Sequence, residues 1–167
     1  ITGEVTSDHF GFSLASGDFN MDGKVDLAVG SYGYSTNTGR AYIFYNGSIV
    51  TENASGADVI ITGSTAADLF GIMLTAGDFN ADGQTDLAVS ATQTGAAGKV
   101  YLFYGDGTLP TTAGTADVTI TGKSGVYGLG RSPVAGDFNA DGRVDLAVGA
   151  SYYTSDIGEA YIFYNDG

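Results

Sequence analysis

The fold prediction starts from one stretch of sequence, Asp18-Phe19-Asn20-Met21-Asp22-Gly23-Lys24-Val25-Asp26-Leu27-Ala28-Val29. Its first nine residues place oxygen-bearing side chains at positions 1, 3, 5 and 9 and a glycine at position 6. From Val25 to Val29, polar or small side chains alternate with aliphatic ones, which is the period of a β-strand. The stretch therefore predicts a tight polar loop that leads directly into a strand.

This stretch occurs three times along the chain, beginning at Asp18, Asp78 and Asp137. The tripeptide Ile1-Thr2-Gly3 also recurs, at positions 61–63 and 120–122, so successive repeats are offset by 60 and 59 residues. The one-residue difference falls in the loop 91–98, where a length change is tolerated. Self-similarity at a fixed spacing indicates a repeat architecture. We therefore expect one repeat domain over residues 1–167, with units of approximately 1–60, 61–119 and 120–167.

Each unit is expected to contain four short strands. In addition to residues 25–29, strands are predicted at 11–16, 41–45 and 59–62, where aliphatic, aromatic and β-branched residues gather between glycines. Apolar residues nowhere recur at helical spacing over a long window, so helices should be scarce. Four antiparallel strands per repeat predict an all-β fold of β-propeller blades, with three blades per chain. A sandwich of irregular hairpins is the alternative, but it gives no reason for turn chemistry repeated at a fixed phase.

The repeated loops predict calcium sites. Oxygen ligands at positions 1, 3, 5 and 9, a backbone carbonyl at position 7 and a glycine at the sharp turn suit Ca²⁺, which takes six to eight oxygens. Without a cation, the clustered carboxylates would repel one another. We therefore predict three Ca²⁺ ions per chain. The predicted ligands are Asp18, Asn20, Asp22, Lys24 (backbone) and Asp26; Asp78, Asn80, Asp82, Gln84 (backbone) and Asp86; and Asp137, Asn139, Asp141, Arg143 (backbone) and Asp145.

An EF-hand loop begins in a similar way, but it requires a bidentate glutamate at position 12 and a helix on either side. Position 12 is Val29, Val89 or Val148 in the three repeats, within a predicted strand. Mg²⁺ is less suitable, because it prefers compact octahedral shells that retain several waters. Each loop is therefore predicted to be a Ca²⁺-binding turn between two strands of one blade.

The composition excludes several other classes of protein. The chain has 6 basic and 19 acidic residues and a formal net charge of −13. This charge disfavours nucleic acid and anionic membranes as partners, because phosphate binding needs clustered Lys and Arg. Six positive charges from three Ca²⁺ ions would raise the net charge from −13 to −7, so the loops account for most of the acidity. No run approaches the roughly 18 apolar residues of a membrane-spanning helix, and the lack of cysteine excludes disulfides and thiolate chemistry.

The chain resembles the FG-GAP repeats of the integrin α-subunit β-propeller and of related bacterial and fungal proteins over essentially its whole length. Phe10-Gly11 and Phe70-Gly71 match the "FG" element, and the third unit has Leu129-Gly130 at that phase. The "GAP" element is altered in every unit and lacks proline. The resemblance implies a propeller with Ca²⁺ in the blade hairpins, on extracellular or cell-surface proteins that bind other proteins or glycans. Integrin ligand specificity is not carried over, because the "GAP" elements differ.

The third unit predicts assembly. It lacks an outermost strand after the predicted strand at 161–164, whereas Ile1-Thr2-Gly3 matches the end of such a strand. Three blades alone leave open sheet edges, which favour pairing with another chain. We therefore expect a head-to-tail homodimer that forms a six-bladed ring. The alternative is a segment cut from a longer, seven-bladed chain.

The sequence offers little support for catalysis. His9 is the single histidine and is expected on an exposed loop, and the acids outside the loops, Glu52, Asp58, Asp117, Asp156 and Glu159, are scattered. The segments 31–37 and 151–156 are rich in Tyr, Ser and Thr, which suits stacking on sugars, adaptable protein contacts or packing at the rim. We predict a non-enzymatic, Ca²⁺-binding module for extracellular adhesion or recognition of protein or glycan ligands. The alternatives are a carbohydrate-binding lectin and a purely structural, self-assembling propeller scaffold.

Overall fold

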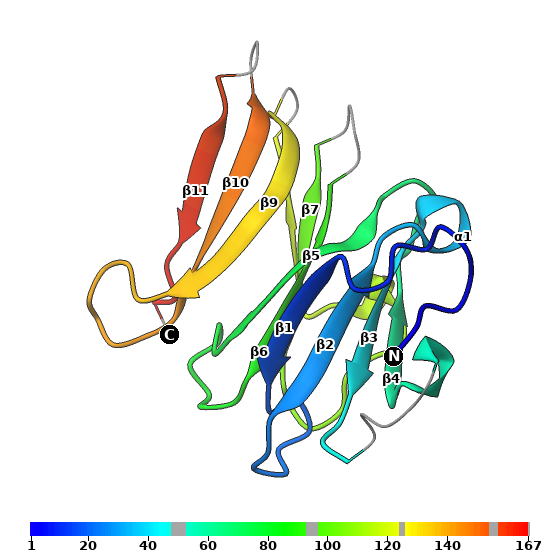
Figure 1. Cartoon of the computed structure of the whole chain (residues 1–167). Coiled ribbons are helices and arrows are strands. Elements are labelled where there is room, and N and C mark those ends of the chain that lie inside the picture. The colour runs from blue at the N-terminus through cyan, green and yellow to red at the C-terminus, as the bar shows by residue number, and fades with distance from the viewer. Residues whose placement is uncertain (48–52, 93–96, 124–125, 154–156, 167) are drawn as a thin grey trace.

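The computed structural model describes residues 1–47, 53–92, 97–123, 126–153 and 157–166. In these residues, three antiparallel sheets lie one behind another along the chain (Figure 1). The first sheet has the order β1 (Ser13–Gly17), β2 (Asp26–Ser31), β3 (Arg40–Phe44) and β4 (Val59–Thr62). The second has the order β5 (Phe70–Gly77), β6 (Asp86–Ala91), β7 (Lys99–Phe103) and β8 (Val118–Thr121). The third has the order β11 (Glu159–Phe163), β10 (Asp145–Tyr153) and β9 (Val126–Gly136).

The all-β prediction of antiparallel propeller blades is confirmed, and the described helices are single short turns. These turns are α1 (Tyr34–Asn37), η1 (Ala54–Gly56) and η2 (Ala113–Thr115). The expected unit boundaries after residues 60 and 119 fall inside β4 and β8, so a sequence repeat and a sheet are out of phase by a few residues. Glu52, Asp156 and residues 93–96 of the predicted variable loop lie outside the described residues.

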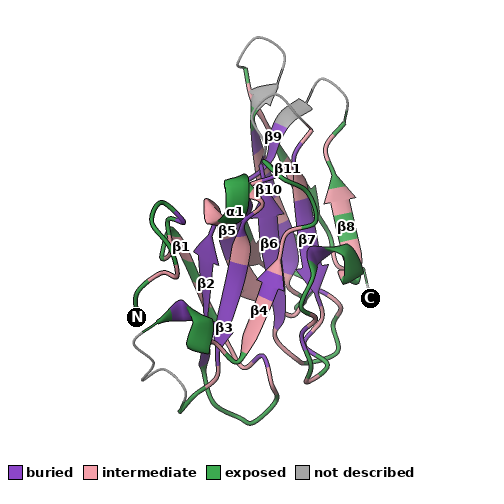
Figure 2. Ribbon diagram, turned by 90° about the vertical axis from the view of Figure 1, so that its right-hand side faces the viewer, coloured by how far each residue is buried: buried purple, intermediate pink, exposed green. Residues whose placement is uncertain are grey.

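The central strands of the second sheet are buried on both faces. Every residue of β6 is buried, with Leu87 and Val89 directed toward the first sheet and Ala88 toward the third. In Figure 2 the inner strands are mainly purple, while β4 and β8 carry more pink and green. In β6 the alternation therefore separates large from small side chains, because the second sheet packs against a neighbouring sheet on either side.

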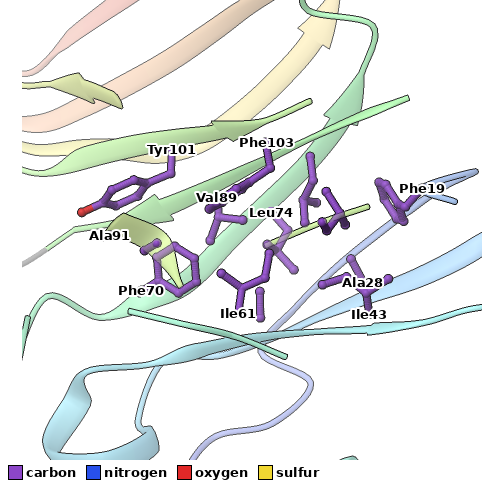
Figure 3. Close-up of a cluster of buried hydrophobic side chains, with 14 residues drawn as sticks. Phe19, Ala28, Ile43, Ile61, Phe70, Leu74, Val89, Ala91, Tyr101 and Phe103 are labelled. Atoms are coloured by element: carbon purple, nitrogen blue, oxygen red, sulfur yellow. The ribbon is translucent and has the colours of Figure 1, made fainter. Parts of the chain in front are cut away.

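The contact between the first two sheets forms the largest apolar cluster of the described residues. Figure 3 shows Ile61 and Ile43 from the first sheet opposite Leu74, Val89 and Phe103 from the second. A second cluster joins the other face of the second sheet to Leu129, Leu146 and Val148 of the third. Burial of apolar area between sheets, rather than within one sheet, therefore supplies most of the core.

The "FG" element Phe70-Gly71 connects the second sheet to the first. Phe70 is 1% exposed and meets Tyr101 and Phe103 edge-on, with ring centroids 5.5 and 6.3 Å apart. Its backbone forms an isolated bridge with Gly39 of the first sheet. Gly71 has φ +84°, and a Cβ at this position would overlap the carbonyl oxygen of Arg40. A glycine is therefore required twice over, for its conformation and for the close approach of two backbones.

The third repeat keeps this arrangement with leucine in place of phenylalanine. Leu129 is buried and bridges Gly98 as Phe70 bridges Gly39. Gly130 has φ +104°, and a Cβ there would lie 2.8 Å from Cγ2 of Thr92. The departure from the "FG" pattern thus changes the side chain that fills the space between sheets and preserves the backbone contact.

Candidate metal sites in the strand-joining loops

Each predicted metal loop connects the first two strands of a sheet, and its polar side chains fold back on its own backbone. In the first loop, Oδ1 of Asp18 and Oδ1 of Asn20 both accept hydrogen bonds from the backbone N–H of Asp22, at 3.1 and 3.0 Å. Oδ2 of Asp18 accepts from the N–H of Gly23 at 2.8 Å. Gly23 has φ +81°, so the residue at position 6 adopts the left-handed region that glycine favours. The loop therefore brings the position 1 and position 3 oxygens to one point.

The other two loops reproduce this geometry closely. Asp82 donates its backbone N–H to Asp78 and Asn80, each at 3.1 Å, and Gly83 donates to Asp78 at 2.9 Å. In the third loop the corresponding three distances are 3.1, 3.0 and 2.8 Å, with Asp137 and Asn139 as acceptors. Three different sequence contexts thus give one arrangement of side-chain oxygens.

The aspartate at position 5 is exposed in each loop. Its Oδ1 accepts the backbone N–H of position 7, at 2.9 Å from Lys24, 2.8 Å from Gln84 and 2.9 Å from Arg143. Oδ2 of Asp22 lies 3.5 Å from Nζ of Lys24, which partly offsets the negative charge of the first loop. The hydrogen bond from the Arg143 backbone, together with that from the Asn139 side chain, lowers the pKa of Asp141. Position 7 therefore contributes its N–H group in the structure, while the role of its carbonyl oxygen stays a prediction.

The aspartate at position 9 has a structural role that the sequence did not reveal. Asp26, Asp86 and Asp145 are fully or almost fully buried. Oδ2 of Asp26 accepts the N–H of Phe19 at 2.9 Å, and Oδ1 accepts the N–H of Asn46 at 2.8 Å. The same pair of bonds recurs from Phe79 and Gly105 to Asp86, and from Phe138 and Asn165 to Asp145. This carboxylate therefore links the loop to the second residue after the third strand of the sheet.

The electrostatics of the second loop show how closely its acids are grouped. Burial, with smaller contributions from the nearby negative charges of Asp82 and Asp78, raises the pKa of Asp86 to about 6. The N–H groups of Gly105 and Phe79 act in the opposite direction but do not cancel these effects. The structure thus places the carboxylates of positions 1, 5 and 9 near enough to repel one another. A bound cation would attract all of these carboxylates, so the net electrostatic interaction in the loop would change from repulsive to attractive.

The donor set fits a hard divalent cation, although the side chains do not already form a closed cage. Among the described residues, no group of three or more acidic or histidine side chains stands ready to hold an ion. Each carboxylate oxygen of Asp18 and its counterparts accepts one backbone N–H, and a carboxylate oxygen has a second lone-pair direction available. Carboxylate and amide oxygens are the ligands that Ca²⁺ prefers. The donor types of each loop are therefore those that suit Ca²⁺.

A second candidate site is an aromatic group beside the first sheet. His9 is exposed, as expected, and its ring stacks on Tyr32 with a centroid distance of 4.7 Å and an interplanar angle of 6°. Phe12, also exposed, meets Tyr32 edge-on at 4.7 Å. Further along the same loop, the Arg40 guanidinium lies 3.6 Å from the ring centroid of Tyr34. The predicted aromatic loop 31–37 is thus extended by residues from the segment before β1, a contact that sequence spacing could not predict.

Comparisons with known proteins agree with this geometry. Residues 10–44 match the FG-GAP repeat, and residues 78–148 match the FG-GAP-like repeat. The chain belongs to the FG-GAP repeat family. It is 35% identical over 159 residues to the phosphatidylinositol-glycan-specific phospholipase D of Mus musculus, covering 85% of this chain and 18% of the relative. It is 34% identical over 155 residues to integrin alpha-6 of Gallus gallus, covering 89% of this chain and 14% of the relative.

The FG-GAP match includes the features described above. The first matched segment begins at Phe10-Gly11 and ends at the last residue of β3, and the second begins at Asp78 and contains the loops of the second and third sheets. The chain spans less than a fifth of the length of these two relatives. Among the described residues, no helix is long and apolar enough to cross a membrane. The chain is thus an FG-GAP propeller module, related both to an integrin alpha subunit and to a phospholipase D.

Proposed function

We propose that this chain is a Ca²⁺-binding, non-enzymatic FG-GAP module that acts in extracellular adhesion or recognition. The observation that carries the proposal is the threefold recurrence of one loop geometry, in which a side-chain oxygen of Asp18, Asp78 or Asp137 and one of the following Asn accept the same backbone N–H. Similarity to integrin alpha-6 supports a recognition role. FG-GAP is a non-catalytic repeat, and similarity to a phospholipase D covers 18% of that protein, which is consistent with a module outside the catalytic part.

In this proposal the loop residues at positions 1, 3, 5 and 9 would hold the ion. Bound Ca²⁺ supplies positive charge among the clustered carboxylates and links them more rigidly than hydrogen bonds alone. Asp26 and its counterparts hold the loop to the end of the third strand, so a rigid loop also fixes that part of the sheet. Calcium would therefore stabilise the module rather than contact a partner directly.

Glycan binding is a second candidate for the recognition role. It is favoured by the aromatic group of His9, Phe12 and Tyr32, in which the two exposed rings of His9 and Phe12 flank the half-buried Tyr32 and offer flat surfaces on which sugars stack. Screening the chain against a glycan array, beside the Tyr32→Ala variant, tests this role. Binding that depends on Tyr32 supports a lectin, whereas no binding to any glycan favours a protein partner.

The calcium proposal is tested by thermal unfolding in Ca²⁺ and in EDTA. A site that binds only the folded chain stabilises it by about 2.7 kcal/mol when the ion is present at about 100 times the dissociation constant. Asp82→Asn keeps an oxygen for the Gln84 N–H but removes the charge of a ligand. We expect this variant to lose stability in Ca²⁺ and to change little in EDTA.

The matched control is Asp106→Asn, which removes an exposed carboxylate outside the metal loops while keeping an acceptor for the N–H of Thr108. It should respond to Ca²⁺ as the unmodified chain does. An equal loss of stability for Asp82→Asn in both buffers would contradict the assignment of the metal site.

A further inference from the structure

The connection between β3 and β4 carries a short motif that neither the calcium loops nor the aromatic group uses. Asn53, Ala54 and Ser55 form the triplet Asn-x-Ser, in which the middle residue is not proline. This triplet is the acceptor for N-linked glycans in secreted proteins, where it lies on surface loops. Because so short a motif also arises by chance, its position in the fold decides whether a glycan fits there.

The fold exposes the two residues of the triplet that define the acceptor. Ala54 is completely buried and packs in an apolar cluster of the first sheet. Asn53 and Ser55, on either side of it, are both exposed. The turn η1 begins at Ala54, and the backbone N–H of this residue donates to the carbonyl oxygen of Thr2 at 2.8 Å. The buried alanine therefore anchors the turn while its two polar neighbours stay at the surface.

The side chain of Asn53 is held in a defined geometry. Its Oδ1 accepts the backbone N–H of Ser55 at 2.9 Å, so the amide caps the turn. Its Nδ2 donates one long hydrogen bond, at 3.5 Å, to the carbonyl oxygen of Gly3. An amide nitrogen carries two hydrogens, and this contact uses one of them. The side-chain nitrogen is therefore not fully committed to the fold.

The second repeat has the same turn without the triplet. Thr112 takes the place of Asn53 before η2, and Gly114 takes the place of Ser55. Oγ1 of Thr112 accepts the backbone N–H of Gly114 at 3.4 Å, and the alanine between them is 1% exposed. Thr112 is exposed as well, although this turn lies well inside the chain. The fold thus requires neither the asparagine nor the serine, and surface exposure belongs to the turn itself.

We propose that Asn53 is an acceptor for an N-linked oligosaccharide. The inference rests on the proposed extracellular function, because this modification belongs to secreted proteins. The sugar donor is an oligosaccharide carried on a lipid diphosphate. Its anomeric carbon forms a bond to Nδ2 of Asn53, and the bond from that carbon to the diphosphate oxygen breaks. The electron pair of the broken bond stays on the diphosphate, which leaves with the lipid, and Nδ2 loses one proton.

The site is separate from the predicted calcium ligands. The hydrogen bonds of Asn53 and the packing of Ala54 involve the turn, the segment before β1 and the apolar cluster of the first sheet. None of the loop aspartates takes part in these contacts. Glycan attachment and calcium binding can therefore succeed or fail independently of each other.

Expression of the whole chain behind a cleavable secretion signal in cultured mammalian cells tests the proposal. Asn46-Gly47-Ser48 is a second triplet, and its serine lies outside the described residues, so Asn46→Gln is introduced throughout. Protein from both the cells and the medium is treated with peptide N-glycosidase F, which removes N-linked glycans. We expect the treatment to increase the electrophoretic mobility of the chain. Mass spectrometry should then find an aspartate in place of Asn53.

Matched variants assign the modification to the turn. Asn53→Gln and Ser55→Ala should each abolish the mobility shift, while Ser55→Thr should keep it. In the Asn53→Gln chain, Thr112→Asn with Gly114→Ser transfers the triplet to the second repeat. A Cβ at Gly114 would lie 3.4 Å from Oγ of Ser64, an ordinary contact, so the turn accommodates the serine. This variant should regain the shift.

Equal mobility before and after the enzyme, or an undiminished shift in Asn53→Gln, would overturn the proposal. A transferred triplet that stays unmodified would contradict the role assigned to the turn. Thermal unfolding of the same protein in Ca²⁺ and in EDTA keeps the two proposals apart. Calcium-dependent stability without a glycan rejects only the acceptor site, and a glycan on a chain that does not respond to Ca²⁺ rejects only the calcium function.

Discussion

Replacing Phe70 by alanine tests how the sheets are held together. Phe70 is 1% exposed between the first two sheets and meets two aromatic rings edge-on (Figure 3). Burial of this degree predicts a loss of about 4 kcal/mol in the free energy of unfolding, within the range for buried Phe→Ala changes. For a chain of this length, that loss corresponds to a fall of roughly 10 °C in Tm.

Phe10 provides a matched comparison inside the same molecule. It meets Tyr42 and Phe44 at 5.4 and 6.4 Å, nearly the geometry of Phe70, but none of the described sheets covers it and it is only partly buried. Phe10→Ala should therefore cost about half as much, on the order of 2 kcal/mol. The difference between the two variants measures the contact between sheets, separately from the aromatic contacts within one sheet.

Urea unfolding followed by far-ultraviolet circular dichroism gives both free energies, with equal slopes required for the comparison. Phe70→Leu serves if Phe70→Ala does not fold, and should cost less because Leu129 fills the same position in the third repeat. Equal losses for Phe10→Ala and Phe70→Ala would refute the view that the packing between sheets dominates.

Three further predictions concern the backbone contact and the loops. Gly71→Ala should destabilise the chain by at least about 1 kcal/mol more than Gly11→Ala. Both glycines have φ near +85°, but only at Gly71 would a Cβ overlap a neighbouring strand. Urea unfolding of the two variants measures the difference in the free energy of unfolding. In EDTA, the raised pKa of Asp86, about 6, gives a stabilising contribution that is full below about pH 4 and is lost as the pH rises through 6. Ca²⁺ should reverse that slope, and thermal unfolding at several pH values in both buffers would show whether it does. Asp26→Asn should destabilise the chain even in EDTA, because it replaces one of two acceptors of backbone N–H groups, while Asp22→Asn should have a clear effect only in Ca²⁺.

The sequence predicts the loops and strands well because their signals are local. The glycine at Gly23, the spacing of Asp18, Asn20 and Asp22 and the alternation after Val25 all act within a dozen residues. Repetition strengthens these signals, since a turn that occurs three times at one phase must fit one fold.

What the sequence does not predict depends on contacts between distant segments. Asp26 looks like one more ligand, but it binds the N–H of Asn46, twenty residues later, after an intervening strand has returned to the loop. The sequence identifies Gly71 as part of the "FG" element but does not show why a glycine stands there. The structure gives the reason, because a Cβ at Gly71 would overlap the backbone of Arg40 in the first sheet. The offset between repeat and sheet has the same origin, because β4 pairs with β3 before it although its sequence matches the start of the next unit.

Calorimetric titration of the metal-free chain with Ca²⁺ tests the central claim most directly. Three equivalent loops predict three bound ions per chain, and Asp82→Asn should reduce that number to two while Asp106→Asn leaves it at three. A chain that takes up no Ca²⁺, or one whose stoichiometry is the same with and without Asp82, would contradict the account.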